Sequence, residues 1–225
     1  MGMTRRTLLG TGVALAAARV EAAAPGPDAG APADAPLCTD RMPVIPVERQ
    51  TELQRKASAE FLAGRGTPVF GPFVPLLRSP EVMLRAKALG DYLRFSSSLP
   101  PKLNELAILL TARHWSQGYE WAIHQPLALK AGLGAEVIAA VAVGRRPSTL
   151  DQGEQVVHDF ISELLGHQGV SDASYQAAVR RFGEQGTIDL VSVSGYYTFL
   201  AMVLHVARTP PPRGAPSLEP FVCAG

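Results

Sequence analysis

Cysteine is scarce in this chain of 225 residues, which contains only Cys38 and Cys223. They lie near opposite ends in proline-rich surroundings, and no CxxC pair exists, so the sequence argues against a dithiol redox centre. In an oxidising compartment the two could form a disulfide, but spacing alone equally allows two unpaired thiols.

The chain also has no large excess of positively or negatively charged residues. The 21 Lys and Arg residues nearly balance the 20 Asp and Glu residues, and the formal net charge is +1. Nucleic-acid binding usually needs a concentrated positive field, so nucleic acid is not an expected partner. With 47% hydrophobic and 18% charged residues, the composition is that of a globular protein, and the length fits one domain.

No apolar run near the N-terminus is long enough to span a bilayer, which takes about 20 residues. Residues 1–24 contain the pair Arg5-Arg6 and then a short apolar run from Leu8 to Ala18. This segment resembles a twin-arginine export signal, which predicts a periplasmic or secreted protein without a stable membrane span after processing. An unprocessed membrane-tethering N-terminus is the alternative, and the cleavage site stays open.

The rest of the chain divides by composition. Residues 25–46 are rich in Ala, Pro, Gly and Asp and predict a flexible leader. Residues 47–209 predict the folded domain, and residues 210–225 an irregular tail after the run of prolines at 210–212.

Apolar residues recur at helical spacing from residue 48 onward, and no segment alternates as a strand would. The prediction is an all-α multi-helix bundle, with a loop over 64–79 and a bend at Pro126. Ser79 and Pro80 suit a helix start, as cap and first helical residue. The expected helices cover 48–63, 80–95, 102–116, 119–131, 135–143, 150–166, 171–182 and 187–208.

Two of these helices are unusually apolar. The helix over 102–116 is dense enough in leucine and isoleucine to be the core element. The last helix is apolar on nearly every side, which indicates either an oligomer interface or a central position.

The residues best suited to chemistry gather between Glu105 and His124. Glu120 and His124 are one helical turn apart, so their side chains share a face. A histidine can take and give a proton near neutrality while a carboxylate orients it or acts as a second base. The same spacing also occurs in modest surface pairs, and Glu105 in a first helical turn needs no role beyond the helix dipole.

Four patches, at residues 99–109, 119–124, 131–133 and 195–197, together resemble the carboxymuconolactone decarboxylase family of the alkylhydroperoxidase D-like superfamily. The resemblance covers roughly residues 80–207 and rests on the order and spacing of the patches. It implies a helical protomer that assembles as a homo-oligomer, a trimer or a hexamer.

In alkylhydroperoxidase D proteins the pattern is Glu-x11-Cys-x2-Cys-x3-His. Glu105 and His124 fall on its acid and histidine, but Gln117 and Glu120 stand in place of the two cysteines. Thiol peroxidase chemistry needs those sulfurs, so it is not expected. The resemblance instead implies the branch without CxxC, in which proton transfer is the chemistry.

The expected function is therefore a decarboxylase-like proton transfer on a small carboxylated lactone or enolisable acid, without metal or other cofactor. His124 is the expected acid and base, Glu120 its partner and Glu105 an orienting carboxylate. The residues expected to contact the substrate are Trp115, Gln117, Tyr119 and Trp121. The alternative is a non-catalytic oligomeric binding protein on the same scaffold, and a metal site lacks a third identifiable ligand.

Overall fold

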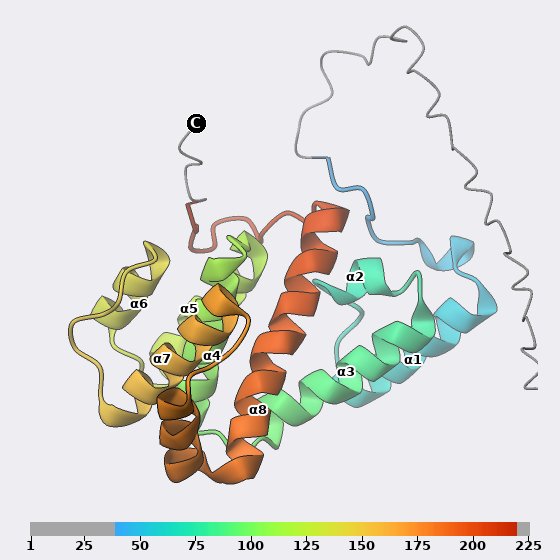
Figure 1. The fold of residues 1–225 in the computed structure, drawn as a ribbon. Coiled ribbons are helices and arrows are strands. Elements are labelled where there is room, and N and C mark those ends of the chain that lie inside the picture. Colours follow the sequence, from blue (N-terminus) through green and yellow to red (C-terminus); the bar gives the residue numbers. More distant parts are fainter. Residues whose placement is uncertain (1–38, 220–225) are drawn as a thin grey trace, which may run out of the picture. The chain divides into compact units, whose positions relative to one another are not determined.

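A computed structural model describes residues 39–219 of the chain (Figure 1). In this range every regular element is a helix and no strand occurs, which confirms the all-α prediction. A short 3-10 helix at Val47–Arg49 precedes eight α-helices: α1 (Glu52–Arg65), α2 (Phe73–Leu76), α3 (Pro80–Phe95), α4 (Pro101–His114), α5 (Gly118–Lys130), α6 (Ala135–Ala142), α7 (Gln152–His167) and α8 (Asp172–Ala207).

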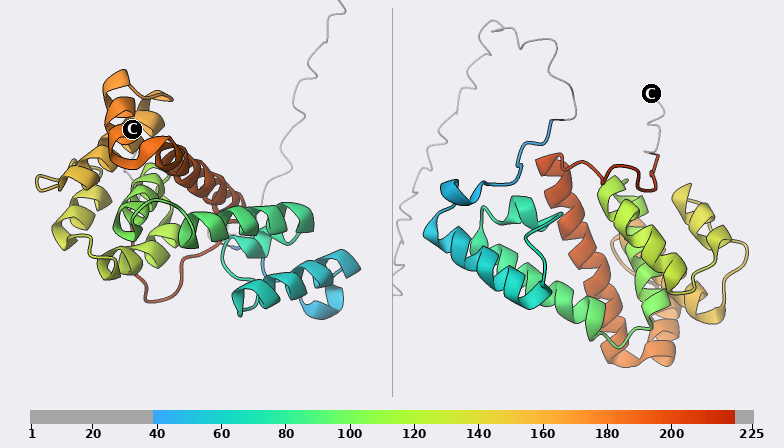
Figure 2. Two further views of the ribbon diagram at one scale, coloured as in Figure 1. Left: turned by 90° about the horizontal axis from the view of Figure 1, so that it is seen from below. Right: turned by 180° about the vertical axis from the view of Figure 1, so that it is seen from behind.

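The centre of the core is α4, as the sequence predicted. Nine of its 14 residues are buried, and it packs against α5, α6, α7 and α8. The long helix α8 lies between this group and the pair formed by α1 and α3, and the further views in Figure 2 show the same order. Packing of α3 against α1, α2 and α8 brings the first part of the domain onto the bundle.

Two predictions near the start of the domain were wrong. The first helix begins at Glu52 rather than at residue 48, because Gln50 is extended and Thr51 forms a capping box with Gln54. The segment 64–79 is not wholly a loop, since it contains the single turn α2. Ser79 does precede α3, but its side chain makes no capping hydrogen bond there.

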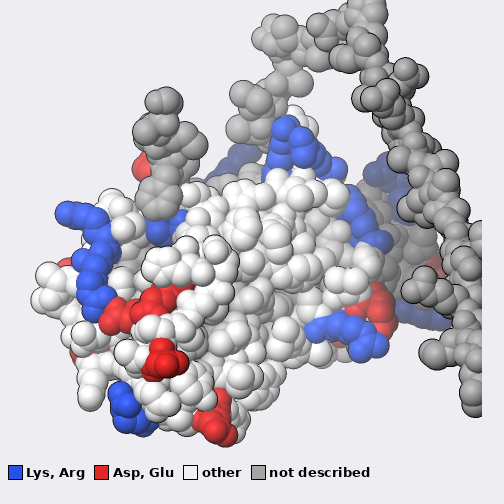
Figure 3. Space-filling view, in the orientation of Figure 1, with Lys and Arg blue, Asp and Glu red and all other residues white. Residues whose placement is uncertain are grey.

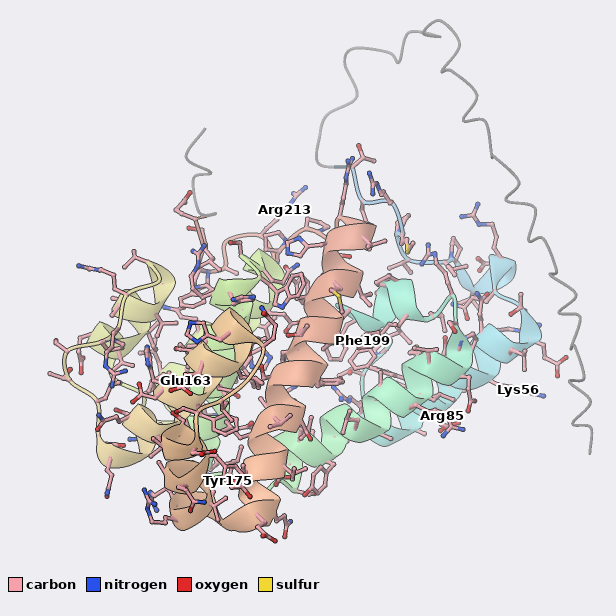
Figure 4. All side chains as sticks on the ribbon, in the orientation of Figure 1. Lys56, Arg85, Glu163, Tyr175, Phe199 and Arg213 are labelled. Carbon is pink, nitrogen blue, oxygen red and sulfur yellow. The ribbon has the colours of Figure 1, made fainter. Side chains whose placement is uncertain are left out.

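The predicted helices over 171–182 and 187–208 are both present, and they share the label α8 because they meet at a kink at Gly183. This glycine has φ 71° and ψ 177°, a conformation open to glycine alone. The start of α8 is tied to α7, because Ser171 donates its backbone N–H to Glu163 at 2.7 Å. Figure 4 labels Glu163 and Tyr175 at this corner.

Parts of the expected leader and tail contact the domain. In the leader, the backbone N–H of Arg41 donates to the carbonyl of Ala207 at 2.7 Å. In the tail, Leu218 is buried against the core and the carbonyl of Glu219 accepts from Arg113 at 2.6 Å. The expected export signal, Cys38 and Cys223 lie outside the described residues.

The last helix has two unlike faces. By length and composition α8 could cross a membrane, yet half of its most apolar window is buried, as in the core helix of a soluble protein. Its other face exposes an apolar stripe made of Ile188, Val191, Met202 and Val206, which we call the α8 stripe. Figure 3 shows that charged side chains are absent from the middle of the surface in front of α8.

Candidate active site

Three ionisable side chains meet where α4 and α5 pack together. Nδ1 of His124 lies 2.7 Å from Oε2 of Glu105, and Nε2 of the same ring lies 3.6 Å from Oε2 of Glu120. The first distance is that of a strong hydrogen bond, and the second is an ion-pair distance slightly longer than a hydrogen bond. His124 therefore lies between two carboxylates, one on each ring nitrogen.

This arrangement fixes which nitrogen of His124 is free to react. An ionised Glu105 can only accept, so Nδ1 carries a proton and donates it. In the neutral ring Nε2 then holds the lone pair, directed toward Glu120. Both His124 and Glu120 are almost fully buried, at 2% and 3% exposure, so bulk water screens this pair little.

Glu120 is the most perturbed acid of the site. Burial raises its pKa, and the nearby carboxylate of Glu105 adds to the rise, while the positive charges of His124 and Arg94 oppose it. Its Oε1 is buried and makes no hydrogen bond within the described part of the chain. A buried acceptor without a partner is costly, and such strain is typical of functional sites.

Two consecutive tyrosines of α8 form the wall opposite α5. The ring of Tyr197 meets the ring of His124 edge to face at 4.9 Å, and Tyr196 and Tyr197 contact each other in the same way at 5.3 Å. Burial raises the pKa of both phenols, so each hydroxyl keeps its proton at neutral pH. Gly90 allows this packing, because a Cβ there would lie 2.3 Å from the Tyr196 hydroxyl.

A small cavity opens beside Glu120 and His124. Its volume is about 30 Å³, close to the roughly 30 Å³ that one molecule occupies in liquid water. The cavity is lined by Arg65, Phe70, Pro72, Phe73, Arg94, Tyr119, Glu120, Ile123, His124, Tyr196, Tyr197 and Leu200. Glu105 is not among these residues, so it contacts the ring of His124 from behind.

Arg94 is the unpaired cation of this cavity. It projects from the last turn of α3 and is partly buried, with its guanidinium 5.3 Å from the ring centre of Phe95. No carboxylate among residues 39–219 is within ion-pair distance of it. Arg65, the other arginine of the cavity, is instead paired with Asp91 at 2.6 Å.

Of the four residues expected to contact the substrate, only Tyr119 lines the cavity. Trp121 is 2% exposed and belongs to the hydrophobic core. Trp115 donates its indole N–H to the Thr198 hydroxyl at 3.1 Å and does not reach the cavity. The reason is geometric: α5 is apolar on most sides, so its sequence does not distinguish a residue facing the core from one facing the cavity.

Gln117 occupies the position of the first cysteine of the peroxidase pattern, and its side chain has a structural role there. Its side-chain oxygen accepts from the backbone N–H of Tyr119 at 2.9 Å and so caps the start of α5. Its amide nitrogen lies 3.5 Å from the carbonyl of Ala201. The expected substrate contact of Gln117 is therefore not seen, whereas Glu120 at the second cysteine position faces the cavity.

Sequence reasoning missed Arg94, Tyr196 and Tyr197 as site residues. The two tyrosines had a signal, since they form part of the resemblance at 195–197. Arg94 had none, because it looks like any basic residue in the last turn of a helix. In the described part of the chain, no group of three or more His, Cys, Asp or Glu side chains is placed to hold a metal ion.

The described residues form an all-α domain, and the comparisons with solved structures identify its fold. No protein-family model matches the chain, and no curated protein matches it significantly. Among solved structures it is similar to the alkylhydroperoxidase AhpD core of an uncharacterised peroxidase-related protein from Ralstonia eutropha, with TM-score 0.59 and 16% identity over 77% of this chain and 92% of the other.

A second similar structure comes from Agrobacterium tumefaciens. It is a protein of unknown function connected by its name with AhpD and antioxidant defence. The TM-score is 0.54 with 17% identity, and the match covers 60% of this chain and 93% of the other. The chain thus has the AhpD-like fold. At such low identity the likeness extends to the fold alone.

Proposed function

We propose that this protein catalyses cofactor-independent proton transfer, by which it decarboxylates or isomerises a small carboxylated lactone or another enolisable acid. The observation that carries the proposal is the buried row Glu105–His124–Glu120, which ends at a cavity beside the unpaired Arg94. A thiol peroxidase reaction is not proposed, because Gln117 and Glu120 replace the two sulfurs it needs.

Each group has a distinct part in such a reaction. In decarboxylation the bond between the substrate carbon and its carboxylate breaks, carbon dioxide leaves, and the electron pair is delocalised into an enolate. Arg94 attracts the anionic substrate and stabilises the enolate oxygen. The protonated form of Glu120 or His124 then donates a proton to the carbon, and Glu105 holds the imidazole in the required tautomer.

Isomerisation uses the same groups without loss of carbon dioxide. The free Nε2 of His124 removes a proton from the carbon next to the carbonyl, and the proton returns to a different carbon of the enolate. Burial raises the pKa of Glu120, which favours the protonated carboxyl that donates in this step.

The test is turnover of a panel of carboxylated lactones and β-keto acids, read as carbon dioxide release and as deuterium incorporation from the solvent. His124→Ala should lower the rate by about 10²- to 10⁴-fold, the range for a general acid or base. The matched control is His167→Ala, which removes an exposed histidine at the end of α7. Wild-type protein that releases no carbon dioxide and exchanges no deuterium would exclude the proposal.

A second candidate is non-catalytic binding of a small molecule. The observation in its favour is the size of the cavity, which holds about one water molecule because tyrosine and phenylalanine rings fill the remaining space. Entry of a lactone requires Phe70, Tyr119 or Tyr196 to move, for binding as well as for catalysis. Binding of a lactone without deuterium exchange would select this second candidate.

We also propose that the protein is exported. Support comes from the twin-arginine-like segment at residues 1–24. Replacing both Arg5 and Arg6 by lysine should retain the protein in the cytoplasm, as measured by cell fractionation. Equal export of the doubly substituted protein and the wild type would contradict this.

A further inference from the structure

A second hollow lies on the other side of α4 from the candidate active site. It has a volume of about 250 Å³ and is formed by the C-terminal half of α4, the loop after α6 and the second half of α7. Its lining contains three arginines, Arg113, Arg145 and Arg146, together with His114 and His158. No acidic side chain of the described residues contributes to that lining.

The three arginines of this hollow differ in the hydrogen bonds and ion pairs that they already make. Arg113 is buried and donates to the carbonyls of Ala142 and Glu219, so it belongs to the wall. Arg146 is paired with both carboxylate oxygens of Asp159. Arg145 is exposed and makes no ion pair with any residue in 39–219, which leaves its guanidinium available to a ligand.

His158 also lines the hollow, and its Nδ1 has two neighbours. It lies 3.2 Å from the guanidinium of Arg146, which can only donate, and 3.3 Å from Oδ1 of Asp159, which accepts when ionised, so these contacts are compatible with either ring tautomer. Burial lowers the pKa of His158, which keeps the ring neutral at pH 7. His158 is therefore a neutral part of the lining, and the charge of a ligand must be met elsewhere in the hollow.

Besides Ser162 and two glycines, the rest of the lining consists of four apolar side chains, Leu110, Val141, Ile161 and Leu165. An inorganic anion would leave these side chains unused, whereas a small organic acid would cover them with its hydrocarbon part. The volume is below the roughly 300–1,000 Å³ of most ligand sites, so the ligand is small.

We propose that this hollow is a second binding site, selective for a small organic carboxylate whose charge meets Arg145 and whose apolar part covers Leu110 and Ile161. The site is separate from the cavity at His124. Its ligand can therefore be detected without reference to the proposed catalytic activity.

The probe is 4-fluorobenzoate, titrated into the full-length protein and followed by fluorine NMR, with 4-fluorobenzamide as the neutral analogue of the same shape. The carboxylate should bind at least about tenfold more tightly than the amide, since a charge-assisted hydrogen bond contributes roughly 1.5–3 kcal/mol. Affinity should also fall as salt is added, because Arg145 is exposed.

Three variants separate this site from other cationic surfaces. Arg145→Ala should weaken binding of 4-fluorobenzoate by about tenfold. Arg180→Ala, which removes an exposed arginine of α8, and Arg94→Ala, which removes the cation of the candidate active site, should leave this binding unchanged.

Four results would overturn the proposal. They are equal affinity for the acid and the amide, unchanged affinity in Arg145→Ala, loss of binding in Arg94→Ala, and affinity for inorganic phosphate as high as for 4-fluorobenzoate. Circular dichroism of each variant shows whether a loss of binding comes from loss of the fold.

Discussion

Asp189 on α8 and Glu120 on α5 are both buried carboxylates, but their surroundings are opposite. Asp189 is 4% exposed and accepts hydrogen bonds from the hydroxyls of Tyr92, Ser97 and Ser98 and from the backbone N–H of Ser98. Glu120 is 3% exposed, and one of its oxygens accepts none. The two side chains are thus almost equally buried, but both oxygens of Asp189 accept hydrogen bonds and one oxygen of Glu120 accepts none.

The pKa values of the two acids move in opposite directions for this reason. Burial alone would raise the pKa of Asp189, but its four hydrogen bonds hold it below the ordinary value. Burial raises the pKa of Glu120, and no hydrogen bond to Oε1 offsets it. Asp189 therefore holds the segment between α3 and α4 against α8, whereas Glu120 keeps one oxygen without a hydrogen bond beside His124.

The largest expected effect is on the rate. Glu120→Gln keeps the shape of the side chain but cannot carry the proton, so we expect deuterium exchange to slow by about 10²- to 10⁴-fold. The free energy of unfolding at pH 7 should rise, because the disfavoured buried charge is gone. Exchange assays and urea unfolding measure the two effects, and a variant that keeps its rate would remove Glu120 from the mechanism.

The matching change at the other acid should affect stability instead. Asp189→Asn places an amide N–H₂ against donors that now face a carboxylate, which should cost about 1–3 kcal/mol of unfolding free energy. Urea unfolding measures the loss. The exchange rate per folded molecule should be unchanged, and a slowed rate in the folded variant would show that the two regions are coupled.

The pH dependence of stability should separate the same two acids. Asp189 has a lowered folded-state pKa, so its contribution is present above its ordinary value of 3.8 and is lost as the pH falls through the folded value. Glu120 has a raised folded-state pKa. The stabilisation from its protonated form is therefore fully present below its ordinary pKa of 4.5 and is lost as the pH rises through the folded-state value.

The stability gap between wild type and Asp189→Asn should accordingly shrink as the pH falls below about 4, near the ordinary Asp value. The advantage of Glu120→Gln over wild type should grow as the pH rises above 4.5, by at most about 1.4 kcal/mol per pH unit. Urea unfolding between pH 3.5 and 7.5 gives both curves. Parallel curves for both variants would contradict the opposite pKa shifts.

The smallest expected effect on stability concerns the exposed side of α8. We propose that a second copy of this chain covers the α8 stripe, because the surface in front of α8 lacks charge in its middle (Figure 3) and exposes Met202 and Val206. Met202→Glu should change the unfolding free energy of the isolated protomer by no more than about 0.5 kcal/mol. It should nevertheless convert the assembled protein to monomer.

Sedimentation velocity compares this variant with Arg180→Glu, which changes an exposed arginine elsewhere on α8 and should leave assembly intact. A monomeric wild type would contradict the proposed self-association, and so would a Met202→Glu variant that stays assembled.

Local patterns predicted much of this fold. The helix over 80–95 has the predicted bounds, and the leucine-rich pattern identified α4 as the core element. The turn α2 was missed because prolines and glycines on both sides of it resemble a continuous loop. The break expected between residues 182 and 187 agrees with the non-helical backbone of Gly183, where the two segments of α8 meet at a kink.

The site was predictable only in part. Glu120 and His124 share a helix face whatever the rest of the fold does, and their 3.6 Å contact agrees with that spacing. The contact of Glu105 with His124 had no local signal and came from the resemblance alone. Trp115 and Trp121 were expected to contact the substrate but do not line the cavity. The aromatic content of a helix does not indicate which neighbour each ring contacts.

The sequence by itself determined where helices form and which residues one turn apart lie together, because backbone geometry and capping act within a few residues. Only the tertiary structure decided that α3 brings Arg94 to Glu120, that α8 brings Tyr197 to His124, and that Asp189 finds partners for its carboxylate. These contacts depend on how packed helices cross and on which rotamers fit between them, and no single segment contains that information.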